Sequence, residues 1–367
     1  MRVLMDAHML GAHETGNETY VRNLLQALGK RDDVEVFAAV LPDQVGLARS
    51  LGVTPAPLAD TSDIRRLVSG LNGLAREHRV DLMHVTYVGP LVPACPVVVT
   101  VHDVSFRRFP RFFSPRERLL FATLLPWTLR RAAAVITVSQ HARSEILHFY
   151  PHLEGCIHVT LEAADPAFRP LPALEVEKAL HRLGIRQSYV LAVGNLQPRK
   201  NLVRLVKAFA QADVASRVQL VIVGQAQWQA STVVETVRDL GLESAVCFTG
   251  YVGLEDLVAL YSGAALFCYP SLYEGFGLPI LEAMACGAPV MASKITSLPE
   301  VAGDAAILVD PLNVSAMADA MRTVLGDAAK AQALRERGLA RAAELGWDRT
   351  ADGTVGCYRR VLDLVQE

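Results

Sequence analysis

The amino-acid sequence predicts an α/β protein with two doubly wound, Rossmann-like domains, each built on a parallel sheet, that face a cleft. Three observations predict this fold class. Apolar, strand-like runs alternate with helical patterns along almost the whole chain. These runs are nearly continuous in valine, isoleucine and leucine, which is typical of parallel sheets covered by helices on both faces. The same scheme starts again after a proline-rich break in the middle of the chain.

Five runs in the first half read as buried strands: "VLMDAH", "VEVFAAVL", "VDLMHVTY", "VVVTVHD" and "AVITVS". Helical patterns follow the first, second, fourth and fifth of them. The second half repeats the scheme with "YVLAVGN", "VQLVIVG", "AVCFTG", "ALFCYPS" and "PVMAS". The segment between the halves, "EAADPAFRPLP" (162–172), is rich in proline and has no periodicity, which predicts an interdomain linker. We therefore expect one domain at 1–165 and a second at 173–345.

Size and composition agree with a folded two-domain protein. The chain has 367 residues, of which 51% are hydrophobic and 20% charged, and its net charge is −2. A charge so close to zero gives no global field that would attract nucleic acid. The six cysteines are scattered, which favours buried thiols in a reducing cytosol over disulfides or a zinc site. The sequence shows no signal peptide and no apolar run of ~18 residues, so we expect a cytoplasmic protein.

The stretch "YEGFGLPILEAMACG" (273–287) contains the first candidate site. Because "ALFCYPS" reads as a strand, this stretch begins at the carboxyl end of a strand, where α/β sheets bind ligands. Pro279 suits the first turn of a helix, and Gly287 suits its end. The backbone N–H groups near Gly277 and Leu278 would then form a helix N-terminus, which attracts phosphate. Glycine at 275 and 277 lets the backbone approach a ligand closely.

Two carboxylates flank this phosphate site, which suggests a nucleotide sugar. Glu282, one turn into the helix, can accept hydrogen bonds from both ribose hydroxyls, and Glu274 would face the sugar. Spacing alone supports equally well a second interpretation, in which Glu282 is a good helix former and Glu274 a solvated loop residue.

Longer segments decide between these interpretations. "EGFGLPILEAMACGAPVMAS" resembles the E-x7-E signature of glycosyltransferase family 4, a group of retaining, metal-independent sugar transferases with the GT-B fold. "VLAVGNLQPRKNLVRLVKAF" (190–209) resembles the family's phosphate segment. "FTGYVGLEDLVALYSGA" and "SLPEVAGDAAILVDP" are similar to further family segments, in the expected order. The resemblance covers nearly the whole chain and is strongest in the second half.

The resemblance implies a site position by position. Arg199 and Lys200 would bind the diphosphate, Glu282 the ribose, and Glu274 the donor sugar. Two cations beside the leaving phosphates stabilise the charge that develops there. The chain has no D-x-D triplet, so we expect neither a metal nor another cofactor. The whole donor-binding set implied is Gly16, Gly194, Asn195, Arg199, Lys200, Tyr251, Val252, Glu274, Gly275, Phe276, Gly277, Leu278 and Glu282.

The first half carries a candidate catalytic histidine. "VVVTVHDVSF" places His102 at the carboxyl end of a strand. A lone histidine at such a place is more often structural, but the resemblance implies that His102 positions the substrate. The catalytic set expected is thus Glu274, His102, Arg199 and Lys200.

The loop "GAHETGNETYVRNLL" resembles the family's loop near the diphosphate, with one departure. Gly16 matches the family's first glycine, whereas Glu18 and Thr19 stand where glycine and arginine are common. A phosphate contact from an arginine side chain of this loop is therefore not expected.

The segment 106–131 carries seven arginines against one acid, interleaved with aromatic residues such as Phe112 and Trp127. This composition suits a surface that meets anionic lipid headgroups, which predicts peripheral contact with the inner membrane surface. It suits equally well a loop and helix whose aromatic side chains fill the core while the arginines are solvated. A single-stranded nucleic-acid site has no other support in the sequence, and we expect no nucleic-acid partner.

The activity implied is transfer of a sugar, with retention, from a nucleotide-diphosphate donor to an acceptor hydroxyl. A GDP-sugar such as GDP-mannose is favoured over a UDP-sugar, and the acceptor is a saccharide, growing or lipid-linked. The domain at 1–165 would be the acceptor side and that at 173–345 the nucleotide-sugar side, with 346–367 a helix that returns to the first domain. Two alternatives are a non-hydrolysing nucleotide-sugar epimerase and a catalytically silent nucleotide-sugar-binding protein.

Overall fold

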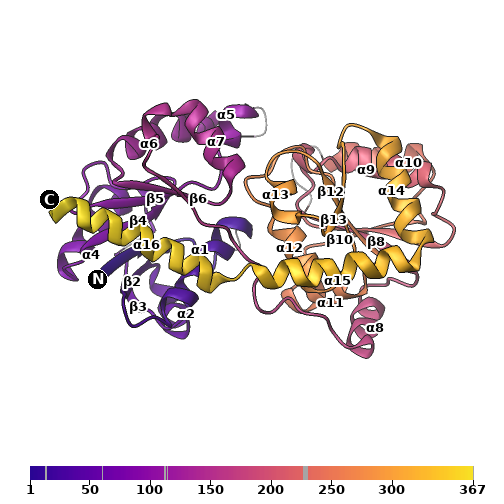
Figure 1. Cartoon of the computed structure of the whole chain (residues 1–367), viewed down its shortest axis with the longest axis horizontal. Helices are drawn as coiled ribbons and strands as arrows, with labels where there is room; N and C mark the ends of the chain where they lie inside the picture. Colours follow the sequence, from indigo (N-terminus) through magenta and orange to yellow (C-terminus); the bar gives the residue numbers. More distant parts are fainter. Residues whose placement is uncertain (13–14, 60, 111–112, 114, 226–229, 367) are drawn as a thin grey trace. The chain divides into compact units, whose positions relative to one another are not determined.

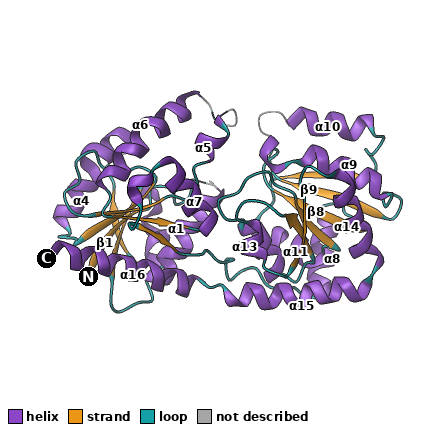
Figure 2. Cartoon of the chain, turned by 45° about the horizontal axis from the view of Figure 1, so that its top comes forward, coloured by secondary structure: helices purple, strands orange, loops and turns teal. Residues whose placement is uncertain are grey.

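The structure is a computed structural model that describes residues 1–12, 15–59, 61–110, 113, 115–225 and 230–366. The chain forms two compact units. The first combines Met1–Glu162 with Gly346–Glu367, and the second is Ala163–Leu345. Each contains one parallel sheet with helices on both faces, so the predicted pair of doubly wound domains is confirmed (Figures 1 and 2). No helix of the described ranges is both long and apolar enough to cross a bilayer.

The sheet of the first unit has seven strands among the described residues, in the order β3-β2-β1-β4-β5-β6-β7. The strands are β1 (Arg2–Asp6), β2 (Glu35–Val40), β3 (Thr54–Pro57), β4 (Leu82–Thr86), β5 (Val97–Thr100), β6 (Ala134–Thr137) and β7 (Ile157–Val159). All neighbouring strands are parallel. The central strands are buried on both faces, which explains their unbroken runs of aliphatic residues.

The helices of the first unit connect these strands. They are α1 (Thr15–Leu28), η1 (Pro42–Gln44), α2 (Val45–Ser50), α3 (Asp63–Arg65), η2 (Arg66–Gly70), α4 (Leu71–Glu77), α5 (Ser105–Arg108), α6 (Pro115–Arg131), α7 (Gln140–Phe149), η4 (Pro151–Leu153) and α16 (Trp347–Gln366). Helix α16, at the end of the chain, packs beside α1 (Figure 1). Arg359 on α16 bonds Asp33 at 2.5 Å, and Thr350 donates to the carbonyl of Leu161 at 2.6 Å.

The sheet of the second unit has the order β10-β9-β8-β11-β12-β13 over the residues that the structure describes. Its strands are β8 (Ser188–Val193), β9 (Val218–Val223), β10 (Val246–Gly250), β11 (Leu266–Tyr269), β12 (Val290–Ser293) and β13 (Ala306–Val309). The chain order reverses between β8 and β11. In sheets of this kind the reversal marks the place where ligands bind, outside the carboxyl ends of the strands.

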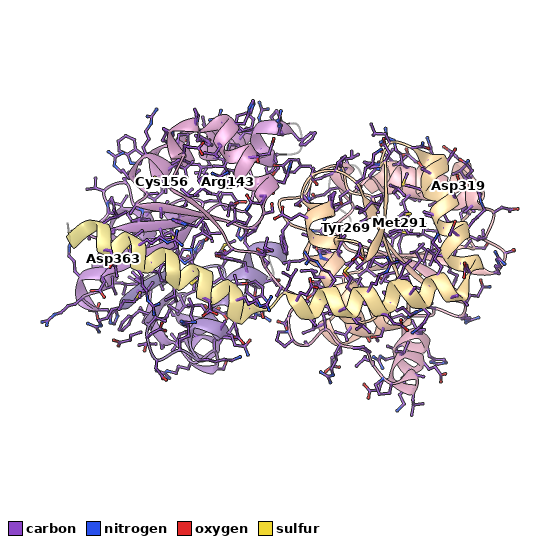
Figure 3. The ribbon with its side chains drawn as sticks, viewed as in Figure 1. Arg143, Cys156, Tyr269, Met291, Asp319 and Asp363 are labelled. Carbon is purple, nitrogen blue, oxygen red and sulfur yellow. The ribbon has the colours of Figure 1, made fainter. Side chains whose placement is uncertain are left out.

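The helices of the second unit form two layers on this sheet. One layer contains α9 (Leu202–Ala212), α10 (Ala230–Asp239) and α14 (Val314–Gly326). The other contains α8 (Ala173–Arg182), α11 (Leu254–Gly263), α12 (Leu278–Ala285) and α15 (Ala328–Glu344). The short elements η5 (Pro198–Lys200) and α13 (Leu298–Ala302) lie in loops. Tyr269 and Met291 are buried in this unit, and Asp319 lies at its surface (Figure 3).

The proline-rich segment 163–172 packs against the second unit. The ring of Phe168 meets that of Tyr261 edge-on at 5.8 Å, and the backbone N–H of Leu171 donates to Ser262 Oγ at 3.2 Å. Burial of an aromatic side chain holds this segment although it has no regular structure of its own.

Candidate functional site

The charged residues predicted for the second unit gather at the reversal point of its sheet. The turn that carries Arg199 and Lys200 follows β8, and the loop that carries Glu274 follows β11. Because β8 and β11 are hydrogen-bonded neighbours, their carboxyl ends lie side by side. The topology therefore brings together residues that are 74 and 75 positions apart in the sequence.

The loop of Glu274 has a defined conformation. Gly277 has a φ of +125°, and a Cβ there would lie 2.7 Å from Leu298 Cδ2, so this position requires glycine. Pro279 occupies the first turn of α12, as predicted. The buried hydroxyl of Ser297 lies 3.0 Å from the carbonyl oxygen of Glu274 and 2.6 Å from that of Phe276. These contacts fix the loop from the side of α13.

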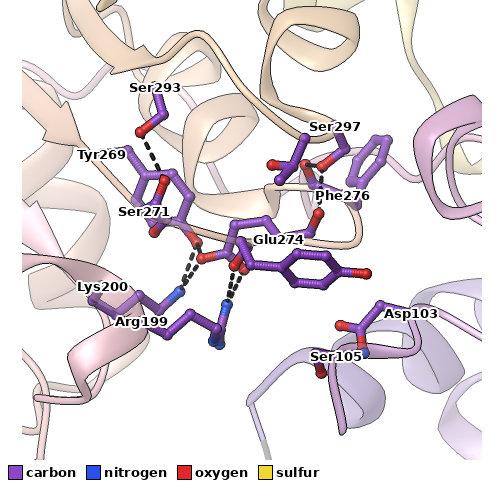
Figure 4. A network of polar contacts seen from close by, with 12 residues as sticks. Asp103, Ser105, Arg199, Lys200, Tyr269, Ser271, Glu274, Phe276, Ser293 and Ser297 are labelled. Carbon is purple, nitrogen blue, oxygen red and sulfur yellow. Dashed lines mark hydrogen bonds and ion pairs between the residues drawn. The ribbon is translucent and has the colours of Figure 1, made fainter. Parts of the chain in front are cut away.

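Glu274 is the centre of a polar cluster (Figure 4). Its Oε1 accepts hydrogen bonds from Lys200 Nζ and from Tyr269 Oη, both at 2.8 Å. Lys200 Nζ also donates to Tyr269 Oη at 2.7 Å. The guanidinium of Arg199 contacts Glu274 Oε2 and donates to the carbonyl of Tyr273 at 2.9 Å. Both carboxylate oxygens therefore have cationic partners.

The charges of this cluster shift the pKa values of its members. Burial by itself would raise the pKa of Glu274, but Arg199 and Lys200 outweigh burial and hold the pKa at about 2. Burial lowers the pKa of Lys200 to about 8, against the stabilising charge of Glu274. At neutral pH the carboxylate is thus ionised and the lysine largely protonated. An anion that binds here competes with Glu274 for both cations.

The turn of Arg199 and Lys200 is held by Asn201. Asn201 adopts a left-handed conformation, with φ 59°, that few residues other than glycine tolerate. Its buried amide donates to the carbonyls of Pro270 and Pro311, at 3.0 and 2.7 Å. The backbone N–H of Leu272 donates to the carbonyl of Arg199 at 2.8 Å. The two loops of the site are therefore joined through their backbones as well as through Glu274.

Glu282 lies one turn into α12 and has a different environment. Tyr261 on α11 donates to Glu282 Oε2 at 2.9 Å. Burial raises the pKa of Glu282 to about 7, while the Tyr261 hydrogen bond opposes this shift. The two glutamates of the E-x7-E spacing therefore differ in charge: Glu274 is fully ionised at neutral pH, whereas Glu282 is close to its midpoint.

Glycines bring the ends of β8 and β9 close together. Gly194 has a φ of +140°, and a Cβ there would lie 3.0 Å from Lys200 Cε. A Cβ on Gly224 would lie 2.3 Å from the carbonyl oxygen of Gly194. Asn195 Oδ1 accepts from the backbone N–H of Gln225 at 3.3 Å. Glycine at 194 thus leaves room for the lysine that reaches Glu274.

The remaining donor-site positions of this unit differ in exposure. Tyr251, directly after β10, is 64% exposed, and Val252 is partly buried. Gly275, Phe276 and Leu278 are buried. A role for Tyr251 and Val252 in binding a base stays a prediction.

In the first unit, His102 follows β5 in a mostly buried pocket of aromatic side chains. Its ring meets Tyr20 edge-on at 4.7 Å and lies 5.7 Å from the ring of Tyr87. His102 Nε2 is 3.6 Å from Glu162 Oε1, too long for a hydrogen bond. Both ring nitrogens are buried without a hydrogen-bond partner in the described part of the chain. Burial lowers the pKa of His102 to about 4 and raises that of Glu162 to about 8, so both are neutral near pH 7.

The structure explains why glutamate stands at position 18, where the resembled family commonly has glycine. Gly16 is exposed in the first turn of α1. Glu18 is buried and accepts from the backbone N–H of Gly11 at 2.9 Å and from Arg22 at 3.0 Å. Glu18 therefore ties the loop to its helix.

The segment 106–131 combines features of both interpretations of its sequence. Phe106 is buried in the core, and Arg108 bonds both carboxylate oxygens of Glu145, at 2.6 and 2.8 Å. On α6, Leu119 and Leu120 are exposed, and the guanidinium of Arg131 lies 3.6 Å above the ring of Trp127. Arg111 and Phe112 lie outside the described residues.

Several residues of these sites are not evident from sequence patterns: Tyr261, Tyr269, Ser297 and Glu162. Tyr269 gives one signal, a hydroxyl at the last position of an otherwise apolar strand. The others gain their roles only through contacts with distant parts of the chain.

Comparison with known proteins covers both units. Residues 15–167 match the family described as "Glycosyltransferase Family 4", and residues 177–341 match "Glycosyl transferases group 1". The chain is 35% identical over 266 residues to O-antigen chain mannosyltransferase B of Escherichia coli, which covers 71% of this chain and 70% of that protein. It is 32% identical over 243 residues to serotype-specific mannosyltransferase WbdA of Escherichia coli, over 65% of this chain. That match spans only 30% of the relative's own length.

Solved structures share the fold at low sequence identity. Sucrose-phosphate synthase from Thermosynechococcus elongatus has a TM-score of 0.79 at 22% identity, covering 99% of this chain and all of that one. HepE from Anabaena, solved with UDP and glucose, has a TM-score of 0.75 at 20% identity, covering 100% of this chain and 99% of that one.

Proposed function

The chain belongs to glycosyltransferase family 4, and from this premise we propose that it is a retaining, metal-independent mannosyltransferase that uses GDP-mannose. One observation carries the proposal: Arg199, Lys200 and Glu274 form a single cluster at the reversal point of the sheet. The name of the E. coli relative supports mannose as the sugar. Guanine as the base rests on the resemblance to transferases that use GDP-sugars.

In this proposal the cations of the cluster bind the diphosphate. As the bond between the sugar's anomeric carbon and the phosphate oxygen breaks, negative charge grows on that oxygen, and Arg199 and Lys200 stabilise it. Glu274, released in part by the competing phosphates, accepts hydrogen bonds from sugar hydroxyls. Glu282 accepts from a ribose hydroxyl. Two side-chain cations can thus supply the charge stabilisation that a metal supplies elsewhere.

The new bond forms on the same face of the sugar. The acceptor oxygen attacks the anomeric carbon as the phosphate leaves, and the acceptor's proton passes to the leaving phosphate oxygen. This route needs no separate general base. His102, whose burial lowers its pKa to about 4, is neutral at pH 7 and positions the substrate.

The acceptor in this proposal is a saccharide on a lipid carrier at the inner membrane surface. The names of the E. coli relatives, which refer to O-antigen chains and serotype, support a surface glycan. The outer face of α6 supports a membrane contact, since Leu119 is 67% exposed and its neighbours Arg118 and Leu120 are exposed as well. Apolar side chains among arginines favour a surface of anionic lipid.

Calorimetry with GDP, UDP and ADP, each with and without EDTA, tests the donor site. We expect GDP to bind tightest, with an affinity that EDTA leaves unchanged. Binding only with a divalent metal would contradict the proposal. Release of GDP from GDP-mannose must also require a saccharide acceptor; conversion of GDP-mannose into an epimeric GDP-sugar without an acceptor would favour a non-hydrolysing epimerase.

A further inference from the structure

The hydroxyl of Tyr269 occupies a central place among the charged groups of the second unit. It lies 2.7 Å from Lys200 Nζ and 2.8 Å from Glu274 Oε1, while those two atoms are 2.8 Å apart. The three atoms form a nearly regular triangle (Figure 4). The only signal of this residue in the sequence is its hydroxyl at the last position of an otherwise apolar strand.

The fold holds this hydroxyl in place. Tyr269 ends β11, where it pairs with Ala292 of β12, and it is 2% exposed. Its ring stacks on Phe267, with centroids 5.8 Å apart and planes at 25°. A side chain on a central strand has little freedom to turn, whereas the lysine and arginine reach the carboxylate on long, flexible stems.

We propose that Tyr269 is a positioning residue that keeps Glu274 oriented, and Lys200 correctly placed, when an anionic ligand draws the two cations away. This inference rests on the proposed function, because there the diphosphate is that ligand. The side-chain hydrogen bonds to Glu274 described above come from Arg199, Lys200 and Tyr269. The tyrosine alone among them carries no charge, so a phosphate does not attract it.

The hydroxyl of Tyr269 stays protonated well above neutral pH. Burial, with Glu274 beside it, raises the pKa of Tyr269 far above its ordinary value of 10. The group therefore stays a neutral donor to Glu274 and a neutral acceptor for Lys200. The charged groups that act on the triangle are Arg199 from η5 and, on Lys200, Glu282 from α12.

Tyr269→Phe removes one oxygen and leaves the ring in place. Without that oxygen the Lys200 ammonium loses an acceptor and the Glu274 carboxylate loses a donor. Both losses disfavour the charged forms, so the pKa of Lys200 falls and that of Glu274 rises. The pH range of transfer activity should therefore be narrower in the variant, because its alkaline limb moves to lower pH as Lys200 loses its proton earlier.

Tyr189→Phe is the matched control. Tyr189 is also buried in the second unit, and its hydroxyl donates to the carbonyl of Leu260 at 2.7 Å, with none of the cluster's side chains as its partner. Tyr189→Phe loses one buried hydrogen bond and Tyr269→Phe loses two, so both variants should lose thermal stability, Tyr269→Phe somewhat more. Only Tyr269→Phe should change the titration of the site.

The first measurement needs no donor. NMR of protein labelled at the lysine Cε carbons follows six lysines, and Lys200→Arg identifies the signal of Lys200. We expect the pKa of Lys200 to be about one unit lower in Tyr269→Phe, as one lost hydrogen bond to a charged group implies. It should be unchanged in Tyr189→Phe. An unchanged Lys200 pKa in Tyr269→Phe would overturn the inference, whatever the activity.

The second measurement is the pH profile of mannose transfer from GDP-mannose. We expect kcat of Tyr269→Phe to fall about tenfold at its optimum, with a narrower profile and with KM within about threefold of wild type. A profile that coincides with that of wild type would also overturn the inference. If the wild-type protein neither binds GDP nor transfers mannose, the proposed function fails, and the lysine titration still decides the role of Tyr269.

Discussion

Replacement of Glu162 by glutamine should change how the stability of the first unit depends on pH. Glu162 is 3% exposed, and burial raises the pKa of its carboxyl from 4.5 to about 8. The folded state therefore keeps a proton that the unfolded chain loses above about pH 4.5. A group that binds protons more tightly in the folded state makes the free energy of unfolding fall as pH rises.

The size of the effect follows from the two pKa values. Each pKa unit corresponds to ~1.36 kcal/mol, so ionisation of Glu162 costs the folded unit roughly 5 kcal/mol between pH 4.5 and 8. His102 has the opposite effect at low pH. Its pKa is lowered from 6.5 to about 4 in the folded unit, so the free energy of unfolding rises with pH up to about pH 6.5 through this residue. Above pH 6.5 the contribution of His102 is constant, whereas the ionisation of Glu162 should cost the folded unit roughly 2 kcal/mol by pH 8.

Glutamine has the shape of the protonated acid and does not titrate. We therefore expect the free energy of unfolding of wild type to fall relative to that of Glu162→Gln as pH rises. The difference between the two proteins should grow by roughly 2 kcal/mol from pH 6.5 to pH 8. Urea unfolding followed by tryptophan fluorescence measures this in a Trp228→Phe background, where Trp127 and Trp347 of the first unit remain. Glu154→Gln is the control, since that side chain is 75% exposed. Parallel curves for wild type and Glu162→Gln from pH 6.5 to 8.5 would refute the reasoning.

Four further predictions concern the second unit. Lys200→Ala should slow mannose transfer by ~10²-fold or more, as initial rates would show. Glu282→Ala should weaken GDP binding by about tenfold, as calorimetry would show. Wild-type values in both variants would contradict the proposed donor site. Asn201→Ala should lower the free energy of unfolding by about 2–4 kcal/mol in urea, because it removes two buried hydrogen bonds and places alanine in a left-handed conformation. Gly277→Ala should cost roughly 1–3 kcal/mol, through its positive φ and its contact with Leu298, while Gly326→Ala, which has open space, should cost little; equal effects of the two alanines would speak against strain at Gly277.

The sequence predicts the buried centre of each sheet better than its edges. All ten apolar runs identified in the sequence are strands, because a strand buried on both faces needs aliphatic residues throughout. The three strands that were missed, β3, β7 and β13, all lie at sheet edges. β3 reads "TPAP", and proline is tolerated only at an edge, where one side of the strand has no partner to bond. Such short edge strands depend on their neighbours and leave little pattern of their own.

The candidate site also contains residues that the sequence predicts and residues that it does not. Arg199, Lys200 and Glu274 are visible because they stand in long segments that resemble a known family, and the structure places all three in contact. Tyr269 and Glu162 are not visible, since each acquires its role from a partner that only the fold brings near. Sequence spacing also does not distinguish Glu274 from Glu282 in their state of ionisation. Their opposite pKa shifts arise from different surroundings: two cations outweigh burial at Glu274, whereas burial outweighs the Tyr261 hydrogen bond at Glu282.

The placement of α16 has a consequence for biosynthesis. Tyr358 on this helix is fully buried, and its hydroxyl lies 2.5 Å from Nδ1 of His84 on β4. The first unit therefore needs α16, which follows the second unit in the sequence, to close its own core, although most residues of the first unit leave the ribosome before the second unit. The second unit, continuous in sequence, is complete earlier. A ribosome that stops within α16 would release a chain whose second unit is whole and whose first unit exposes an unfinished, aggregation-prone surface to chaperones and proteases.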